Sequence, residues 1–193
     1  MRSVPCFNTP LLNAVSRDLA GWPTEKRSER SGVLRLSDSA EVTYSQRQKR
    51  LFMASIQSCE FSVEGPVNRP LQGKIRAHQS GWFTRHPVTF VAGKRAAADA
   101  AAAWLNGFPN LQATLSELDY RRFSLVITDQ KWCCTIEPWG ASEVVCKLPP
   151  LRRYLRLEPQ QRMLLLSVMN MVSQAMGQLM DAGANRACQA KAG

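Results

Sequence analysis

The sequence predicts an α+β protein with one antiparallel sheet of about six strands in two three-strand sets, helices on one face of the sheet and a long amphipathic C-terminal helix. Three observations support this. Two regions alternate polar and apolar residues in short segments separated by turn residues, as half-buried strands do. An alanine-rich segment of high helix propensity lies between these regions. After the second region, apolar residues recur at three- and four-residue steps, the period of an amphipathic helix.

The N-terminal part of the chain shows little pattern. We expect residues 1–38 to form an irregular segment, interrupted by prolines and glycines, with one short helix at 11–20. A further helix is predicted over residues 39–55, because Asp38 and Glu41 resemble a capping pair at its start. The apolar positions of this helix would be Val42, Leu51, Phe52 and Ile56, with Arg47, Lys49 and Arg50 on its solvent side.

The first strand set is predicted over residues 60–64, 71–78 and 82–91. Glycines, prolines and serines separate these segments, which is the chemistry of turns. The alanine-rich helix follows at 93–105, and residues 111–118 add one or two further helical turns.

The second strand set is predicted over residues 121–128, 132–137 and 143–148. We expect Pro149 and Pro150 to end the sheet, because proline cannot donate a hydrogen bond to a sheet ladder. The chain then alternates helices with two sets of strands, which suits a single antiparallel sheet covered by helices.

The long C-terminal helix begins near Pro159, a residue that suits the first turn of a helix. Its apolar stripe consists of Leu165, Val168, Met169, Val172, Ala175, Met176 and Leu179. We expect one α+β domain over residues 39–182 and a frayed tail over residues 183–193. Five methionines lie on this helix; core packing is their ordinary role, although such a face also suits an apolar pocket.

The chain is basic, with a net charge of +10 from 25 Lys and Arg against 15 Asp and Glu. This charge is spread along the chain, so it favours weak attraction to nucleic acid or anionic lipid without assigning either partner. No uninterrupted apolar run is long enough to cross a membrane, and the N-terminus lacks the apolar stretch of a signal peptide. We therefore expect a cytoplasmic protein without a membrane span.

The residue types that usually carry catalysis are sparse and irregularly spaced. The six cysteines fit neither a disulfide framework nor a zinc site, so we expect reduced thiols that mostly pack in the core. Only two histidines, His78 and His86, are present, and no catalytic or phosphate-binding motif occurs. The sequence predicts no metal and no cofactor, and it favours a protein without enzymatic activity.

Arginines and aromatic residues gather between residues 120 and 157. A guanidinium group beside an aromatic ring suits a phosphate, a carboxylate or a stacked base. The candidate binding residues are Arg121, Arg122, Trp139, Arg152, Arg153, Tyr154 and Arg156. The alternative is a rim of arginines that lie over the sheet edge and pair with Glu137, Glu143 or Glu158.

Four stretches in this part of the chain form a distinctive pattern: Trp139–Val145, Pro149–Leu157, Gln161 and Tyr120–Phe123. Together they resemble an uncharacterised proteobacterial family, the domain of unknown function 3156. The resemblance would cover residues 58–175 and leave the N-terminal 40 residues outside. It implies a bacterial cytoplasmic protein, and it implies no activity, cofactor or site residue.

The leading interpretation is a non-enzymatic binding or accessory protein that uses the groove between sheet and helix or the arginine-rich edge. A first alternative is nucleic-acid binding through phosphate contacts of the same arginines. A second is a secretion-chaperone-like protein, by fold analogy alone, which the basic charge opposes. A third is an enzyme that uses an exposed cysteine thiol. A protein, an anionic ligand and nucleic acid all stay open as partners, as does the oligomeric state.

Overall fold

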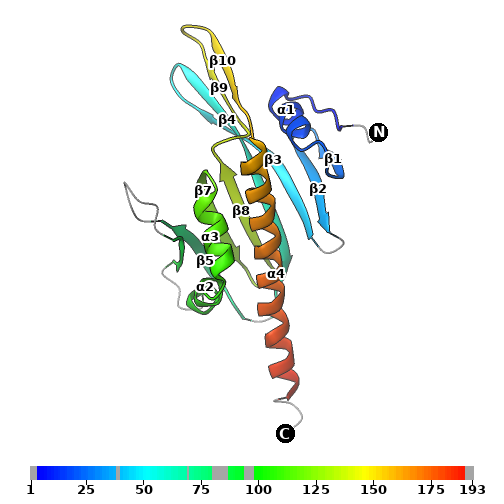
Figure 1. The fold of residues 1–193 in the computed structure, drawn as a ribbon, viewed down its shortest axis with the longest axis vertical. Helices are drawn as coiled ribbons and strands as arrows, with labels where there is room; N and C mark the ends of the chain where they lie inside the picture. The colour runs from blue at the N-terminus through cyan, green and yellow to red at the C-terminus, as the bar shows by residue number, and fades with distance from the viewer. Residues whose placement is uncertain (1–3, 38–39, 69, 80–86, 94–97, 190–193) are drawn as a thin grey trace. The chain divides into compact units, whose positions relative to one another are not determined.

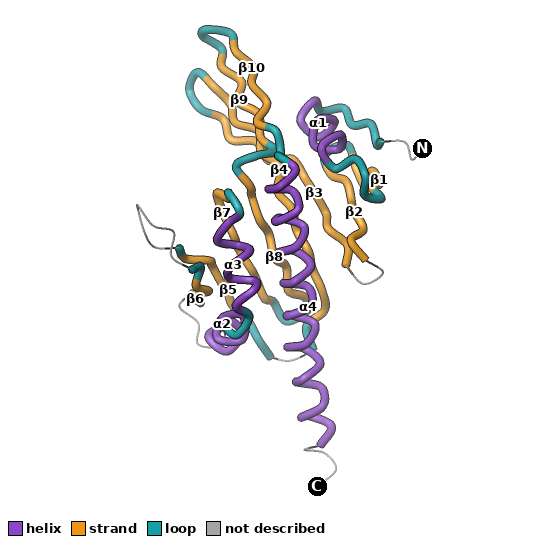
Figure 2. The backbone as a smooth tube through the Cα atoms, viewed as in Figure 1, coloured by secondary structure: helices purple, strands orange, loops and turns teal. Residues whose placement is uncertain are grey.

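The computed structural model describes residues 4–37, 40–68, 70–79, 87–93 and 98–189, and it confirms an α+β fold with a large antiparallel sheet. Within these residues it contains four helices and ten strands (Figures 1 and 2). In chain order they are α1 (Pro10–Asp18), β1 (Thr24–Ser28), β2 (Ser31–Ser37), β3 (Ala40–Arg50), β4 (Ala54–Pro66), β5 (Gly73–His78), β6 (Thr89–Ala92), α2 (Asp99–Asn106), α3 (Pro109–Glu117), β7 (Tyr120–Ile127), β8 (Lys131–Pro138), β9 (Ser142–Cys146), β10 (Leu151–Leu155) and α4 (Pro159–Gln189).

The sheet has ten strands where we expected six in two sets of three. Its main order is β1-β2-β3-β4-β8-β7-β5-β6, and off this path β9 pairs with β4 and β10. The additional strands are β1, β2, β3 and β10. Pro149 and Pro150 do not end the sheet, because they lie in the turn that joins β9 to β10, where no ladder hydrogen bond is needed.

The helix predicted over residues 39–55 is wrong, because this segment contains β3, a turn and the start of β4. The buried side chains of β3 are Ala40, Val42 and Tyr44. They recur at every second residue, which is the period of a strand and not of a helix. Leu51 and Phe52, expected in the buried stripe of a helix, are exposed in the turn that joins β3 to β4.

The remaining predicted elements of the two strand sets are present with shifted ends. The segments predicted at 82–91 and 93–105 are described only in part, as β6 and α2, since residues 80–86 and 94–97 lie outside the described residues.

The N-terminal segment, expected to be irregular, contains regular structure. The short helix predicted there is confirmed as α1, and β1 and β2 form an antiparallel hairpin after it. Gly32 of β2 lies against the ring of Tyr44, and a Cβ at this position would be 2.3 Å from Tyr44 Cζ. Any side chain there would displace the ring, so the close approach of β2 to Tyr44 requires glycine.

The chain divides into two compact units. Unit 1 comprises residues 1–62, 118–122 and 136–166, and unit 2 comprises residues 63–117, 123–135 and 167–193. The predicted domain limits at residues 39 and 182 stay a prediction.

Tyr44 lies at the centre of the core of unit 1. Its ring centroid is 6.0 Å from that of Phe7 and 6.3 Å from that of Phe61. Its hydroxyl lies 3.2 Å from the Oγ of Ser16 in α1, which ties this helix to β3. Burial raises the pKa of Tyr44, so its hydroxyl stays protonated where an exposed tyrosine begins to ionise.

The core of unit 2 is built on helix and strand contacts of its own. The rings of Phe90 and Phe123 lie 5.4 Å apart, and Trp104 Nε1 donates a hydrogen bond of 2.9 Å to the carbonyl oxygen of Ala175. The second contact joins α2 to α4 and satisfies the indole donor of the partly buried Trp104.

Helix α4 carries the buried stripe that its sequence predicts, since every residue of the stripe is buried. The helix extends to Gln189, beyond Gly183, where we expected its end. By length and mean hydropathy (1.2), Pro159–Ala182 is able to cross a membrane, and half of its most apolar window is buried inside the protein. A packed core helix meets the same criteria, and the buried stripe is that of a packed helix.

Candidate anion-binding site

A hollow of about 280 Å³ opens on unit 1, and we call it the arginine hollow. Its lining residues are Arg47, Lys49, Ile56, Ser58, Arg121, Arg122 and Glu137. Strands β3, β4, β7 and β8 supply these residues, and four of the seven side chains are cationic.

The register of β3 and β4 explains how one wall of the hollow forms. Arg47 lies opposite Ser58, and Lys49 lies opposite Ile56. Directly paired residues project to the same side of a sheet, and so do residues two apart in one strand. The two cations and the small Ser58 side chain therefore share one face.

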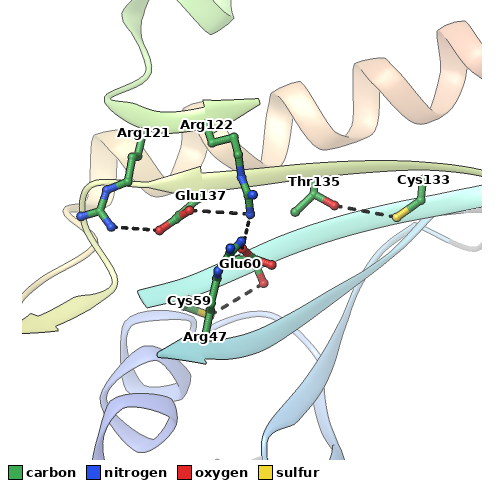
Figure 3. Close-up of polar contacts among 8 residues, drawn as sticks. All are labelled: Arg47, Cys59, Glu60, Arg121, Arg122, Cys133, Thr135 and Glu137. Atoms are coloured by element: carbon green, nitrogen blue, oxygen red, sulfur yellow. Dashed lines mark hydrogen bonds and ion pairs between the residues drawn. The ribbon is translucent and has the colours of Figure 1, made fainter. Parts of the chain in front are cut away.

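Two carboxylates bridge the arginines of the hollow (Figure 3). Glu60 accepts a hydrogen bond of 2.7 Å from Arg47 Nη1 and a second from Arg122. The buried Glu137 accepts one of 3.0 Å from Arg121 Nη1 and lies 3.7 Å from Arg122 Nη2. The hydrogen bond to Glu60 raises the pKa of Arg47. These contacts fix the guanidinium groups in orientation.

An aromatic ring lies beside this network. Arg121 Cζ is 4.5 Å from the ring centroid of Trp139, within the range of a cation–π contact. The Trp139 side chain is exposed, while its backbone N–H donates to the carbonyl oxygen of Asp119 at 3.0 Å. The structure thus brings together three of the predicted site residues, Arg121, Arg122 and Trp139.

Some hydrogen-bond donors of the hollow are not bound by Glu60 or Glu137. Lys49 has no hydrogen-bond or ion-pair partner among the described residues. The Nε of Arg122 is buried and also lacks a hydrogen-bond partner. The four cations that line the hollow, set against Glu60 and Glu137, leave a formal charge of +2.

Arg152 lies elsewhere in unit 1, in an ion pair with a buried carboxylate. Its Nε and Nη2 donate to the two oxygens of Glu143 at 2.5 and 2.9 Å, a bidentate geometry. This hydrogen bonding raises the pKa of Arg152. Arg153, the next residue, is exposed and has no hydrogen-bond or ion-pair partner among the described residues.

Tyr154 and Arg156 surround Asp18, a buried residue at the end of α1, and we call this group the Asp18 cluster. Asp18 accepts hydrogen bonds from the Tyr154 hydroxyl at 2.6 Å, from Arg156 Nε at 3.0 Å and from the Leu157 N–H at 3.1 Å. Burial first, and then the bond to Asp18, raise the pKa of Tyr154. The cluster ties α1 to the segment that joins β10 to α4.

Two of the described thiols are unsuited to nucleophilic attack, whereas Cys6 is exposed and Cys133 and Cys146 are partly exposed. Cys59 and Cys134 are fully buried, and burial raises the pKa of both thiols, which disfavours the reactive thiolate. Among the described residues, no group of three or more His, Cys, Asp or Glu side chains is placed to hold a metal ion. His78 is exposed on β5, and His86 lies outside the described residues.

A second hollow, of about 220 Å³, lies in unit 2 where the α2–α3 connection meets α4. One methionine of α4, Met171, lines it together with Phe108, Leu111 and polar residues. Met163 is exposed, whereas Met180, expected off the buried stripe, is buried. The methionine-rich face is therefore mostly core and contributes little to this hollow.

Sequence reasoning missed Arg47, Lys49 and Glu60 as members of the site. The prediction of a helix over residues 39–55 placed both cations on its solvent side, away from β7 and β8. The alternation of Val42 and Tyr44 with polar residues was the signal that would have identified a strand. In that strand, Arg47 and Lys49 fall on one face, as the hollow requires.

The comparison with known families gives one match and no function. No curated protein matches the chain, and no solved structure does. The family model described as protein of unknown function (DUF3156) matches residues 17–176. The match therefore also covers the last two residues of α1 and strands β1–β3, which we expected to lie outside the family. This match spans most of the 193 residues. The chain therefore belongs to the DUF3156 family of proteins of unknown function.

Proposed function

We propose that this protein is a non-enzymatic binding protein that holds an anionic ligand in the arginine hollow. The observation that supports this most is the surplus of donors among the described residues: neither Lys49 nor the buried Nε of Arg122 has a partner there, and the formal charge of the hollow is +2. A buried donor that lacks a partner is costly, and an anion supplies the missing acceptor.

The geometry favours a ligand with a phosphate or carboxylate group. Arginines present planar pairs of N–H donors to such groups, and a lysine adds a point charge. Glu60 and Glu137 each hold two arginines, so the guanidinium groups are pre-oriented before a ligand arrives. The exposed Trp139 ring adds an apolar surface beside Arg121 for the rest of the ligand.

Inorganic phosphate is the simplest probe of this proposal. Its affinity for the full chain is measured at low ionic strength by calorimetry, for the native protein and for Lys49→Gln. Because no described residue pairs with Lys49, the substitution removes a donor without leaving a described carboxylate unpaired. We expect a loss of affinity of about ten-fold, the value of one charge-assisted hydrogen bond.

The matched control is Arg30→Gln, which removes one exposed cation at the β1–β2 turn, outside the hollow. It should leave phosphate affinity unchanged. Equal losses in both variants would mean that phosphate responds only to the net charge of the protein, and the proposal would be withdrawn.

Nucleic-acid binding is a second candidate, because two exposed cations lie in one row across neighbouring strands. Lys49 and Arg153 lie in the same cross-strand row, through the pairs Lys49–Ile56, Ile56–Val144 and Val144–Arg153. Such a row tracks a phosphate backbone. A single-stranded oligonucleotide should then bind with an affinity that falls steeply with salt concentration. The double variant Lys49→Gln plus Arg153→Gln should reduce the slope of log affinity against log salt concentration. A slope that this double variant does not change would count against the candidate.

The secretion-chaperone-like alternative has no observation in its favour among the described residues, and burial and a raised pKa exclude Cys59 and Cys134 as the exposed thiol that a thiol enzyme would need. We further propose a location in the bacterial cytoplasm, a prediction that follows from the sequence alone.

A further inference from the structure

Two neighbouring turns of unit 1 expose a cluster of large apolar side chains. One turn joins β3 to β4, the other joins β9 to β10, and we call the pair the hairpin tips. Their exposed apolar residues are Leu51 (47%), Phe52 (95%), Met53 (41%), Leu148 (72%) and Leu151 (54%). The turns lie side by side, because the Lys147 N–H donates to the carbonyl oxygen of Met53 at 2.9 Å and Ala54 pairs with Cys146 (Figure 1).

Cations stand directly behind this apolar cluster. Residues paired across β3, β4, β9 and β10 form rows. The row nearest the tips consists of Arg50, Ser55, Val145 and Arg152, and the next row consists of Lys49, Ile56, Val144 and Arg153. Side chains of adjacent rows project to opposite faces of the sheet. Arg50 and Arg152 therefore lie on one face, and Lys49 and Arg153 lie on the other. Lys147 lies in the second turn itself.

No negative charge interrupts this part of the sequence. Residues 42–59 contain three basic and no acidic residues, and residues 144–157 contain four basic and no acidic residues. Of the cations near the tips, only Arg152 has an ion-pair partner among the described residues. The others keep their full charge available for an outside partner.

We infer that the hairpin tips dock on a lipid bilayer that contains anionic phospholipids. The apolar side chains enter the boundary between headgroups and acyl chains, and the cations behind them contact lipid phosphates. This inference does not depend on the arginine hollow.

The distance between the apolar cluster and the basic rows matches the distance between the acyl-chain boundary and the phosphates of a bilayer. A strand rises about 3.3 Å per residue, so the basic rows lie roughly 7–10 Å behind Phe52. Apolar faces of peripheral proteins enter the interface by about 5–10 Å, which leaves the basic rows at the phosphates.

The form of the cluster also favours a bilayer over the two other anionic partners. The apolar residues lie on the turns of two hairpins, so a protein partner would need a matching apolar pocket lined by acidic residues. Nucleic acid offers phosphates without an apolar phase for Leu51, Met53 and Leu148. A bilayer offers both layers in the required order and adapts to the shape of the tips.

Co-sedimentation of the full chain with lipid vesicles tests the inference. One set of vesicles is pure phosphatidylcholine, and the other is phosphatidylcholine mixed with phosphatidylglycerol. We expect the native protein to bind the mixed vesicles and to bind pure phosphatidylcholine far less, because each Lys or Arg near an anionic surface strengthens binding roughly five-fold.

Two double variants separate the two layers. Phe52→Ser plus Leu148→Ser should lower partitioning to mixed vesicles by more than about ten-fold, through lost apolar burial. Arg50→Gln plus Arg153→Gln should lower it by roughly 25-fold. Neither variant changes a residue that lines the arginine hollow, so this test and the phosphate test can fail separately.

The matched controls are Met163→Ser, an exposed apolar residue on α4, and Arg27→Gln plus Arg30→Gln, which removes the same charge from the β1–β2 hairpin. Both should bind vesicles as the native protein does. Three results would overturn the inference: no binding of the native protein to mixed vesicles, equal losses in test and control variants, or tip-dependent binding to an oligonucleotide or an acidic protein but not to vesicles.

Discussion

Two groups of arginines in unit 1 look alike in sequence and differ in structure. Both place arginines beside an aromatic residue and a buried carboxylate. In the Asp18 cluster, one carboxylate accepts three hydrogen bonds, and its donors come from the Tyr154 side chain, the Arg156 side chain and the backbone of Leu157. In the arginine hollow, two carboxylates face four lining cations, and donors are left over.

The difference teaches that open space beside unpaired cations, and not the presence of arginines alone, separates a candidate binding site from a structural group. Asp18 uses its acceptors on groups that close the fold, although Arg162, which donates to the Asp18 carbonyl oxygen, keeps a buried Nε without a hydrogen-bond partner among the described residues. The hollow keeps open space of about 280 Å³ beside donors that lack acceptors. Substitutions in the first group should therefore change stability, and substitutions in the second should change binding.

The largest expected effect is on stability, in the variant Asp18→Ala. It leaves the Tyr154 hydroxyl and the Leu157 N–H without an acceptor in a buried place, so the free energy of unfolding should fall by about 3 kcal/mol. Chemical denaturation measures it. Arg47→Gln, which breaks a partly exposed ion pair of the hollow, should cost less than about 1 kcal/mol. Similar losses in both variants would remove the proposed distinction.

The second-largest effect is a loss of stability in the variant Tyr154→Phe, and the size of this loss depends on pH. Loss of the hydrogen bond to Asp18 should cost about 1.5–3 kcal/mol at neutral pH. Because the folded state raises the pKa of Tyr154, its stabilisation is complete below the ordinary tyrosine pKa of about 10 and is lost as pH rises above it. The gap between native protein and variant should therefore narrow above about pH 10, by at most about 1.4 kcal/mol per pH unit.

Denaturation curves on both sides of that pH check this prediction. Tyr120→Phe is the control: burial raises the pKa of Tyr120, but no carboxylate accepts from its hydroxyl among the described residues. Its cost at neutral pH should be smaller. A gap for Tyr154→Phe that stays constant with pH would show that burial and the bond to Asp18 do not raise the pKa of the hydroxyl.

The smallest effect is expected at Trp139→Ala, beside the hollow. The contact with Arg121 is exposed on one side, so its loss should cost about 0.5–1 kcal/mol in stability. Phosphate affinity should stay within about two-fold of the native value, because Glu137 still orients Arg121. A large loss of phosphate affinity would assign the ring a direct part in binding.

The sequence was sufficient where the structure is set by local pattern. The 3.6-residue period identified α4 and its buried stripe, and alternation identified most strands after residue 60. It failed at β3, where the resemblance of Asp38 and Glu41 to a capping pair suggested a helix with Leu51 and Phe52 among its apolar positions, although Leu51 and Phe52 lie in an exposed turn. The site could be predicted only in part, because Arg47 and Glu60 reach Arg122 through pairings between strands far apart in sequence. Alternation within one strand carries no information on which strand lies beside it.

Within the part of the chain that the structure describes, strand β10 pairs with β9 and with no other strand, so its second side forms an open edge of the sheet. Such an open edge is a template on which another copy of the chain can add a strand and begin to aggregate. Arg152 and Arg153 project on opposite sides of this edge, and two approaching copies would bring like charges together. The exposed Arg153, which drew attention as a ligand contact, would thus also oppose pairing between two copies of β10.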